Sequence, residues 1–292
     1  PGFLIGMAAF ALPVLVLLEA AAVASGADGF ARWLLMLSWG LVGFPVTSLV
    51  PLALTSGCLA LDCGFADFGA ALPLVVSSSS FVLPAWLPAG VRERVEFDRP
   101  SNRRAVLAGA ALWAASTVWL MHMEGAWDEF VPRIVLASVV GPAAGAVGWL
   151  AVDILRDTRR STARSLMLGL VAGMVAVLPG AVSVGMPWSP VVGLLAGGLA
   201  ALAYSLRGAD AALAQRWGLA ILAAAAVGFL APPVSGDTTG LIFAARASVL
   251  FAPVVALVGV VAFSATVSAP VWALVRRHAA RERIPDAIVE GR

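Results

Sequence analysis

Few side chains in the apolar parts of this sequence could do chemistry. Glu19 and Asp153 are carboxylates within or at the end of apolar runs, and His122 lies at the end of another. Ionisable groups in membrane-type segments are costly there and are functional candidates by default. Glu19 has two equally good interpretations, a residue that lines an internal channel or an acid that reaches the membrane surface. For Asp153 the sequence favours an interfacial position beside Arg156, and His122 is interpreted as a lone interfacial histidine.

A run of four serines, at residues 77–80, interrupts a further apolar stretch. Serine hydroxyls in a helix can donate back to carbonyls of the preceding turn, which requires no function, and this interpretation is favoured. The alternative is a polar stripe that faces a cavity or a neighbouring helix. Cys58 and Cys63, the only cysteines, cannot supply a four-ligand metal site and are either a local disulfide or two thiols. The sequence offers no catalytic residue, metal site or cofactor, so we predict that it is not an enzyme.

The helices that carry these groups follow from composition and length. Hydrophobic residues make up 61% of the 292 residues, charged residues 12%, and the mean hydropathy is +0.94. Such a chain is far from a water-soluble domain, and about 20 apolar residues of helix cross a bilayer. We therefore predict an all-α polytopic membrane protein, with one transmembrane domain over 1–275 and a tail over 276–292. The expected spans, about nine in number, are 3–24, 32–55, 67–88, 105–123, 132–155, 165–184, 190–206, 217–234 and 241–274.

Two neighbouring spans carry glycines four residues apart, a spacing that lets helix backbones approach closely within a membrane. The glycines are Gly169, Gly173, Gly193 and Gly197. We expect these two spans to pack against each other through them.

The arginines indicate the orientation. Most of them fall in the loops after the third, fifth and seventh spans and in the C-terminal tail. By the positive-inside rule this face, with the tail, is cytoplasmic. The net charge of +2 gives no indication of nucleic-acid binding. The sequence begins at Pro1 without a signal peptide, and we expect it to be a fragment.

Three stretches of the sequence have the motifs of a known family. Residues 149–153, WLAVD, precede an arginine-rich loop and a glycine-rich pair of spans from Ser165 onward, similar to W-x3-E, a loop and two glycine-rich helices. Residues 3–10, FLIGMAAF, are similar to F-Q-x-x-F-A-A-I, and residues 67–71, DFGAA, to D-F-A-G-G at the outer start of a span. Together they resemble the ammonium transporter family, which includes the Rhesus proteins.

The resemblance implies a fold of two inverted five-helix repeats around a pore, usually in a homotrimer. The nine spans would be the third to eleventh of eleven helices, which leaves the first repeat incomplete. In the family, aromatic side chains at the outer mouth attract the ammonium cation. Paired imidazoles in a narrow apolar lumen then handle its proton.

The family motifs place candidate residues at the outer mouth. Phe3 occupies the position of the first phenylalanine in the family motif F-Q-x-x-F-A-A-I, whereas Met7 replaces the second phenylalanine. Trp119 is only an approximate replacement for an aromatic residue of the family's outer mouth, because the motif around it differs from that of the family. Asp67 is expected mainly to cap and orient its helix rather than to hold the substrate.

The same motifs locate the two pore histidines, and both positions differ in this sequence. The first falls on Val75 or Ser77, depending on small gaps. The second falls on Arg216 without a gap, or on Ala220 with a short one. The histidine-based mechanism of the family is therefore not available at these positions.

The sequence thus predicts a channel-like transporter for ammonium or ammonia in the lipid bilayer of the plasma membrane, homotrimeric and without a nucleic-acid partner. The alternative is a non-conducting membrane scaffold or ammonium sensor. Such a protein would keep the packing glycines, lose the lumen chemistry, and form part of a mixed trimer.

Overall fold

The computed structural model describes residues 18, 29–56, 65–86, 102–158, 162–206, 213–236, 240–244 and 247–282. Within these ranges the chain is helical and forms no strand, with a single antiparallel bridge between Val184 and Gly236. The predicted all-α class is confirmed. Phe3, Met7 and Glu19 of the first predicted span lie outside the described residues, as do both cysteines.

Six stretches among the described residues are long and apolar enough to cross a membrane. They are Gly29–Pro51, Val106–Glu124, Phe130–Leu155, Thr162–Gly180, Gln215–Ser235 and Ala247–Val275, and two shorter apolar helices are Leu72–Phe81 and Ser189–Ser205. Every predicted span contains helix among its described residues, of which the first span has only Leu18. The polytopic membrane class is therefore confirmed, whereas the total of nine remains a prediction.

The helical elements follow one another along the chain as follows: α2 (Gly29–Ser38), π-helix η1 (Trp39–Gly43), α3 (Phe44–Ser56), π-helix η2 (Leu72–Val76), α5 (Ser77–Phe81), 3-10 helix η3 (Leu83–Trp86), α6 (Asn102–Glu124), α7 (Phe130–Leu155), α8 (Thr162–Val177), 3-10 helix η4 (Leu178–Gly180), α9 (Ser189–Ser205), α10 (Leu213–Ser235), α11 (Leu241–Ala244), 3-10 helix η5 (Ala247–Leu250) and α12 (Phe251–Glu282).

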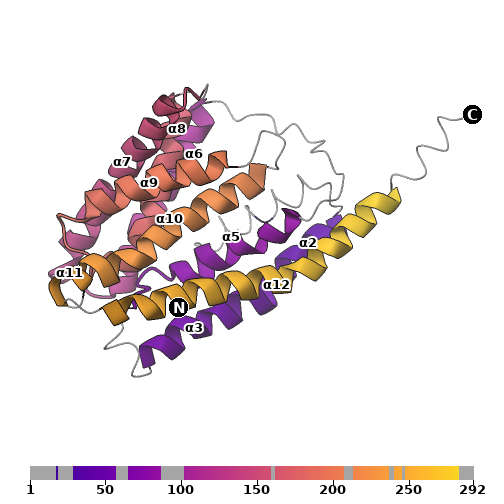
Figure 1. The fold of residues 1–292 in the computed structure, drawn as a ribbon, viewed down its shortest axis with the longest axis horizontal. Coiled ribbons are helices and arrows are strands. Elements are labelled where there is room, and N and C mark those ends of the chain that lie inside the picture. The colour runs from indigo at the N-terminus through magenta and orange to yellow at the C-terminus, as the bar shows by residue number, and fades with distance from the viewer. Residues whose placement is uncertain are drawn as a thin grey trace, which may run out of the picture.

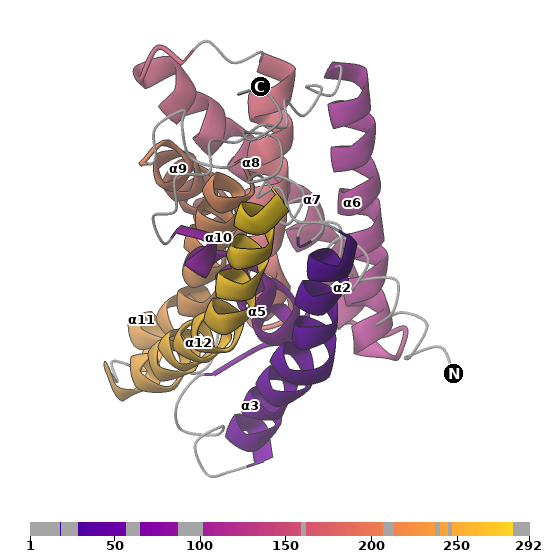
Figure 2. The same cartoon turned by 90° about the vertical axis from the view of Figure 1, so that its right-hand side faces the viewer.

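The elements form two groups that α10 connects (Figure 1). In one group α7 packs against both α8 and α9, and α6 covers α8. In the other, the long helix α12 runs beside α2 and α5, as Figure 2 also shows. Helix α10 contacts α8 and α9 on one side and α5 and α12 on the other. The line between α5 and α10 is therefore the junction of the two groups.

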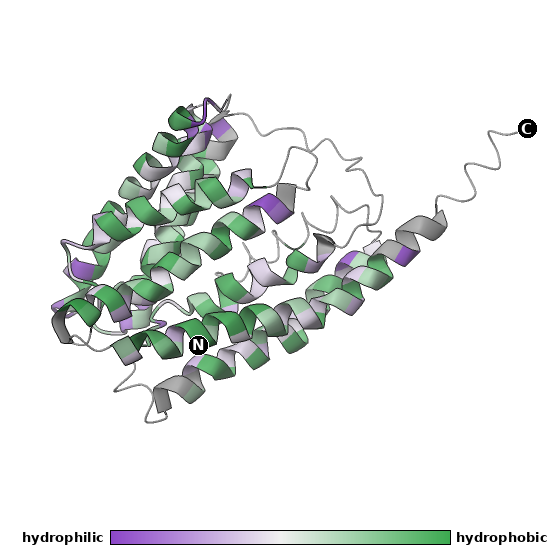
Figure 3. Cartoon of the chain, in the orientation of Figure 1, coloured by the Kyte–Doolittle hydropathy of each residue, from purple (hydrophilic) through white to green (hydrophobic). Residues whose placement is uncertain are grey.

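Apolar side chains cover the helices on the outside as well as the inside (Figure 3). Large hydrophobic residues of α7, α9 and α12 are exposed, among them Leu136, Val147, Leu195 and Val258. A soluble protein would bury such faces, whereas lipid solvates them. The protein is therefore an integral, multi-pass membrane protein.

The predicted span at 67–88 is a broken helix rather than one continuous helix. It passes from η2 to α5 and then to η3. Pro73 fits the first turn of η2, where an N–H would lack a partner anyway. Pro84 cannot donate to a carbonyl one turn back and disfavours the helical conformation of the residue before it. Every residue from Leu72 to Phe81 is buried, so this short segment is surrounded by protein, where irregular backbone is tolerated.

Helices α7, α8 and α9 meet along three pairs of glycines. The pairs are Gly141 and Gly145 on α7, Gly169 and Gly173 on α8, and Gly193 and Gly197 on α9. A Cβ atom added to either α9 glycine would collide with the carbonyl oxygen of the α7 glycine opposite, and a Cβ on either α8 glycine would collide with the backbone of the same α7 glycines. The expectation that the two spans pack against each other is confirmed, since α8 and α9 are in contact. Helix α7 adds a third glycine pair at the same spacing, on which the other two pairs converge.

Candidate functional site

The turn at residues 67–71 begins the broken helix and holds the first candidate group. The N–H of Ala71 donates to Asp67 Oδ1 at 2.6 Å, and the N–H of Leu72 donates to Oδ2 at 3.0 Å. These N–H groups stand at the start of η2, where no preceding turn offers them a carbonyl. The Asp67 carboxylate therefore caps the segment, in the geometry expected from the sequence.

The protonation of Asp67 is set by two opposing effects. Desolvation of the half-buried carboxyl group raises the pKa of Asp67 to about 7, and the hydrogen bonds from Leu72 and Ala71 lower it by less. The ordinary pKa of an aspartate is near 4. Asp67, which precedes the apolar helix, consequently changes its charge around neutral pH.

The 67–71 turn is fixed to two other elements. The N–H groups of Phe68 and Gly69 donate to the carbonyl oxygens of Pro179 and Leu178 in η4, at 3.1 and 2.9 Å. Trp119 of α6 donates through Nε1 to the carbonyl oxygen of Gly69 at 3.1 Å. The structure thus brings Asp67 and Trp119 to the same turn. The Trp119 ring is only 4% exposed, so in this conformation it supports the turn and does not present an open aromatic face.

Ala70 adopts a left-handed backbone conformation, with φ of 53°. The family motif D-F-A-G-G has glycine at this position, whereas the chain has its glycine one residue earlier. Gly69 is itself required, because an added Cβ would lie 2.8 Å from the Leu178 carbonyl oxygen. A left-handed alanine costs roughly 1–2 kcal/mol relative to a right-handed one.

We expect the substitution Ala70→Gly to raise the free energy of unfolding by about 0.5–1 kcal/mol, because it removes this strain at the cost of some chain entropy. The measurement is thermal unfolding of the purified protein in detergent. The matched control is Ala71→Gly, since Ala71 is a buried helical residue with φ of −66° and should lose about 0.5–1 kcal/mol. A loss of stability in both variants would show that the left-handed backbone at Ala70 is not strained.

At the first pore-histidine position, Ser77 forms a polar contact between helices. Ser77 Oγ accepts from Trp39 Nε1 at 3.2 Å and from Ser264 Oγ at 3.3 Å. The Ser77 side chain therefore faces η1 and α12. Val75, the other candidate, is also buried, at 9% exposure.

The serine run combines both interpretations of its sequence. Ser78 and Ser80 donate to the carbonyl oxygens of Leu74 and Val76, at 2.5 and 2.6 Å, as serines without a special role do. Ser77 instead bonds to neighbouring helices, and Ser79 Oγ is buried without a hydrogen-bond partner. Ser77 is therefore the residue of the run whose hydroxyl makes an interhelical polar contact.

At the second pore-histidine position, Arg216 points toward α9. Its Nε donates to the Tyr204 carbonyl oxygen at 3.1 Å, and its guanidinium carbon lies 4.1 Å from the centre of the Tyr204 ring. Buried Ala220 lies one turn further along the same side of α10. Gly218 lies on the opposite side, where an added Cβ would be 3.1 Å from the Ser79 carbonyl oxygen. Helix α10 thus meets α5 at Gly218, and the structure directs Ser77 and Arg216 toward different neighbours.

Asp153 belongs to a buried cluster near the end of α7. Its Oδ2 accepts from Trp149 Nε1 at 3.1 Å and from Ser165 Oγ at 2.6 Å, and the residue is 4% exposed. The expected position beside Arg156 is wrong, because the spacing of four residues places Asp153 on the Trp149 face of α7, toward α8. The cluster continues from Trp149 to the Tyr204 ring at 5.7 Å, which joins it to the contact with Arg216. His122, by contrast, lies exposed at the end of α6.

Two buried tryptophans that the sequence analysis did not single out hold α5. Trp39 binds Ser77, and Trp272 donates through Nε1 to the Phe81 carbonyl oxygen at 2.8 Å. No set of three or more histidine, cysteine, aspartate or glutamate side chains that could hold a metal ion occurs in the described part of the chain.

Comparison with known proteins gives a family and a fold. Residues 108–280 match the profile of the Ammonium Transporter Family. No curated protein matches the sequence.

Several solved structures share the fold. Mep2 from Candida albicans is similar with a TM-score of 0.74 and 18% sequence identity, over 90% of this chain and 61% of that one. Mep2 from Saccharomyces cerevisiae has a TM-score of 0.72 and 19% identity, over 90% and 62%. A structure described as a sensor Amt protein has a TM-score of 0.59 and 16% identity, over 74% and 56%. The chain thus spans about three fifths of the length of the Mep2 structures, and at these identities the likeness concerns the fold alone.

Proposed function

The chain belongs to the ammonium transporter family, and from this premise we propose that it is a transmembrane transporter for ammonium or ammonia. The 67–71 turn carries the proposal. It keeps the order of the family motif, its aspartate caps the broken helix, and it is held by Trp119 and by η4. The substrate side of the site would consist of Phe3 and Met7 with this turn, followed by the line of α5 and α10.

The groups at the two histidine positions favour passage of a neutral molecule. A cation without its water shell is costly in an apolar interior. The described groups near the first histidine position are the hydroxyls of Ser77 and Ser264, which can donate to or accept from ammonia but carry no charge at neutral pH. In this proposal Val75 adds an apolar side chain beside Ser77. Ala220 and Arg216 lie on the side of α10 away from α5, and the positive charge of Arg216 at the cytoplasmic end disfavours cations.

We propose that the protein is a homotrimer in the plasma membrane with its tail (276–292) in the cytoplasm. The arginine distribution supports this orientation. Helix α12 continues past residue 275 to Glu282, so the tail begins as a continuation of the helix.

A second candidate function, a sensor or scaffold that does not conduct, is favoured by the contact of α5 with α10. An added Cβ at Gly218 would lie 2.7 Å from Val82 Cγ2, so the two segments leave no space between them at this level. The fold similarity to a sensor Amt protein is consistent with this alternative.

An assay of ammonium-evoked pH change in liposomes separates the two functions. For a transporter we expect a saturable signal at least about tenfold above empty liposomes, comparable in form to that of an established ammonium transporter. Gly259→Ala is the matched control variant and should conduct like the unmodified protein, because a Cβ at Gly259 meets no atom within 4 Å. If folded protein gives no signal, the transporter proposal is wrong. A rise of its unfolding temperature with ammonium would then support the sensor.

A further inference from the structure

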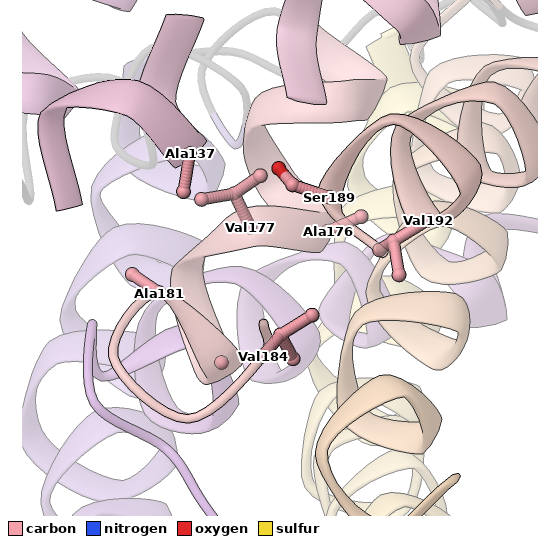
Figure 4. Close-up of a pocket in the computed structure, with 8 residues that line it drawn as sticks. Ala137, Ala176, Val177, Ala181, Val184, Ser189 and Val192 are labelled. Carbon is pink, nitrogen blue, oxygen red and sulfur yellow. The ribbon is translucent and has the colours of Figure 1, made fainter. Parts of the chain in front are cut away.

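A small cavity lies where the end of α8 meets the start of α9. Its volume is about 10 Å³, close to the lower limit for one water molecule. Alanine and valine side chains of α7, α8, α9 and the turn between η4 and α9 form most of its wall, and Ser189 is the one polar residue among them (Figure 4). The cavity is separate from the line between α5 and α10.

The Ser189 hydroxyl is the unusual feature of this cavity. Ser189 is 3% exposed, and its Oγ forms no hydrogen bond within the protein. Figure 4 shows the Oγ atom on the cavity side, near the Val177 side chain. The hydroxyl does not cap α9, because no side-chain cap hydrogen bond is formed at the start of that helix. Buried hydroxyls are normally paired, so this one calls for a partner inside the cavity.

Two helix ends meet around the cavity. Ala176 and Val177 line it from the last turn of α8, which continues into η4. Ser189 lines it from the first turn of α9, where the helix dipole is positive. The Ser189 hydroxyl can both donate to and accept from a molecule in the cavity. A cation would face the positive helix end and an otherwise apolar wall.

We propose that this cavity is a binding site for one small neutral molecule that has a lone pair and a polar hydrogen, either water or ammonia, and that Ser189 Oγ is its anchor. The occupant would lie behind η4. Pro179 and Leu178 of η4 accept the hydrogen bonds of the 67–71 turn. The site therefore supports the segment that positions Asp67, whether or not the protein conducts.

The sign of a stability change tests occupancy. If a bound molecule bonds to Ser189, the substitution Ser189→Ala should lower the unfolding temperature by about 2–4 °C. If the cavity is empty, the same substitution removes an unpartnered buried hydroxyl and should raise the unfolding temperature. Ser183→Ala is the matched control, because Ser183 Oγ is also buried without a partner but does not line the cavity. A rise in both variants would overturn the proposal.

The identity of the occupant requires a direct measurement. In protein with labelled valine methyl groups, we expect magnetisation transfer to the Val177 and Val192 methyls from a bound molecule, and its loss in Ser189→Ala. Transfer from water in ammonium-free buffer assigns water. Replacement of that signal by transfer from ¹⁵N-labelled ammonia at alkaline pH assigns ammonia. Absence of both signals in folded, unmodified protein would refute the site independently of the stability data, and neither result depends on transport.

Discussion

The substitution Gly197→Ala should destabilise the protein by about 3 kcal/mol or more, since overpacking of a close backbone contact cannot be relieved by a side-chain rotation. The added Cβ would collide with the carbonyl oxygen of Gly145. Helix α9 would have to move away from α7, and this would separate the neighbouring contact between Gly193 and Gly141 as well. Thermal unfolding in detergent, followed by the loss of monodisperse protein on size-exclusion chromatography, measures the effect.

The control for this prediction is Gly259→Ala on α12. Its Cβ meets nothing within 4 Å, and alanine favours a helix more than glycine does by about 1 kcal/mol. Gly259→Ala should therefore leave the unfolding temperature unchanged or raise it slightly. Equal losses in the two variants would mean that glycine is needed for another reason than the close approach of α7 and α9.

Replacing Asp67 by alanine should lower the free energy of unfolding by about 2 kcal/mol, because the N–H groups of Ala71 and Leu72 lose their acceptors. The same substitution should abolish most ammonium-dependent signal in liposomes, since the start of the broken helix is no longer fixed. Unfolding in detergent and the liposome assay are measured on the same preparation, so that a loss of transport can be compared with the fraction of folded protein.

The effect of Asp67→Ala should depend on pH, and the sign follows from the raised pKa. A pKa of about 7 in the folded protein means that the folded state binds the proton more tightly than the unfolded state does. The contribution of Asp67 to stability is therefore greatest below about pH 4 and declines as the pH rises to about 7. The difference between the unmodified protein and Asp67→Ala should be larger at pH 5 than at pH 8. A larger difference at pH 8 would show that Asp67 is ionised throughout this range.

The sequence predicted the features that depend on local pattern. Apolar runs of sufficient length identified the membrane class, and the D-F-G-A-A motif identified the cap at Asp67. The glycine spacing correctly predicted that α8 and α9 pack together, but it did not identify the third pair on α7, on which the glycines of both helices converge. The choice of α7 as the central helix depends on tertiary geometry, which the spacing does not contain.

Contacts between distant residues were beyond the sequence. The bond between Trp39 and Ser77 spans 38 residues, and that between Trp272 and Phe81 spans 191. Asp153 was assigned to the surface because a neighbouring arginine offers an obvious partner, whereas Trp149 and Ser165 offer two buried donors. The sequence also could not show that Arg216 and Ala220 lie on a different side of α10 from the contact with α5.

The tryptophan contacts of α5 have a consequence for the order in which the protein assembles during synthesis. Helix α5 leaves the ribosome early, yet Ser264 and Trp272, which bind its Ser77 and Phe81, follow 187 and 191 residues later. A short polar helix with an open carbonyl is poorly suited to lipid on its own. Helix α5 therefore reaches its final environment only after α12 has been made, so a helix late in the described part of the chain completes the surroundings of one made well before it.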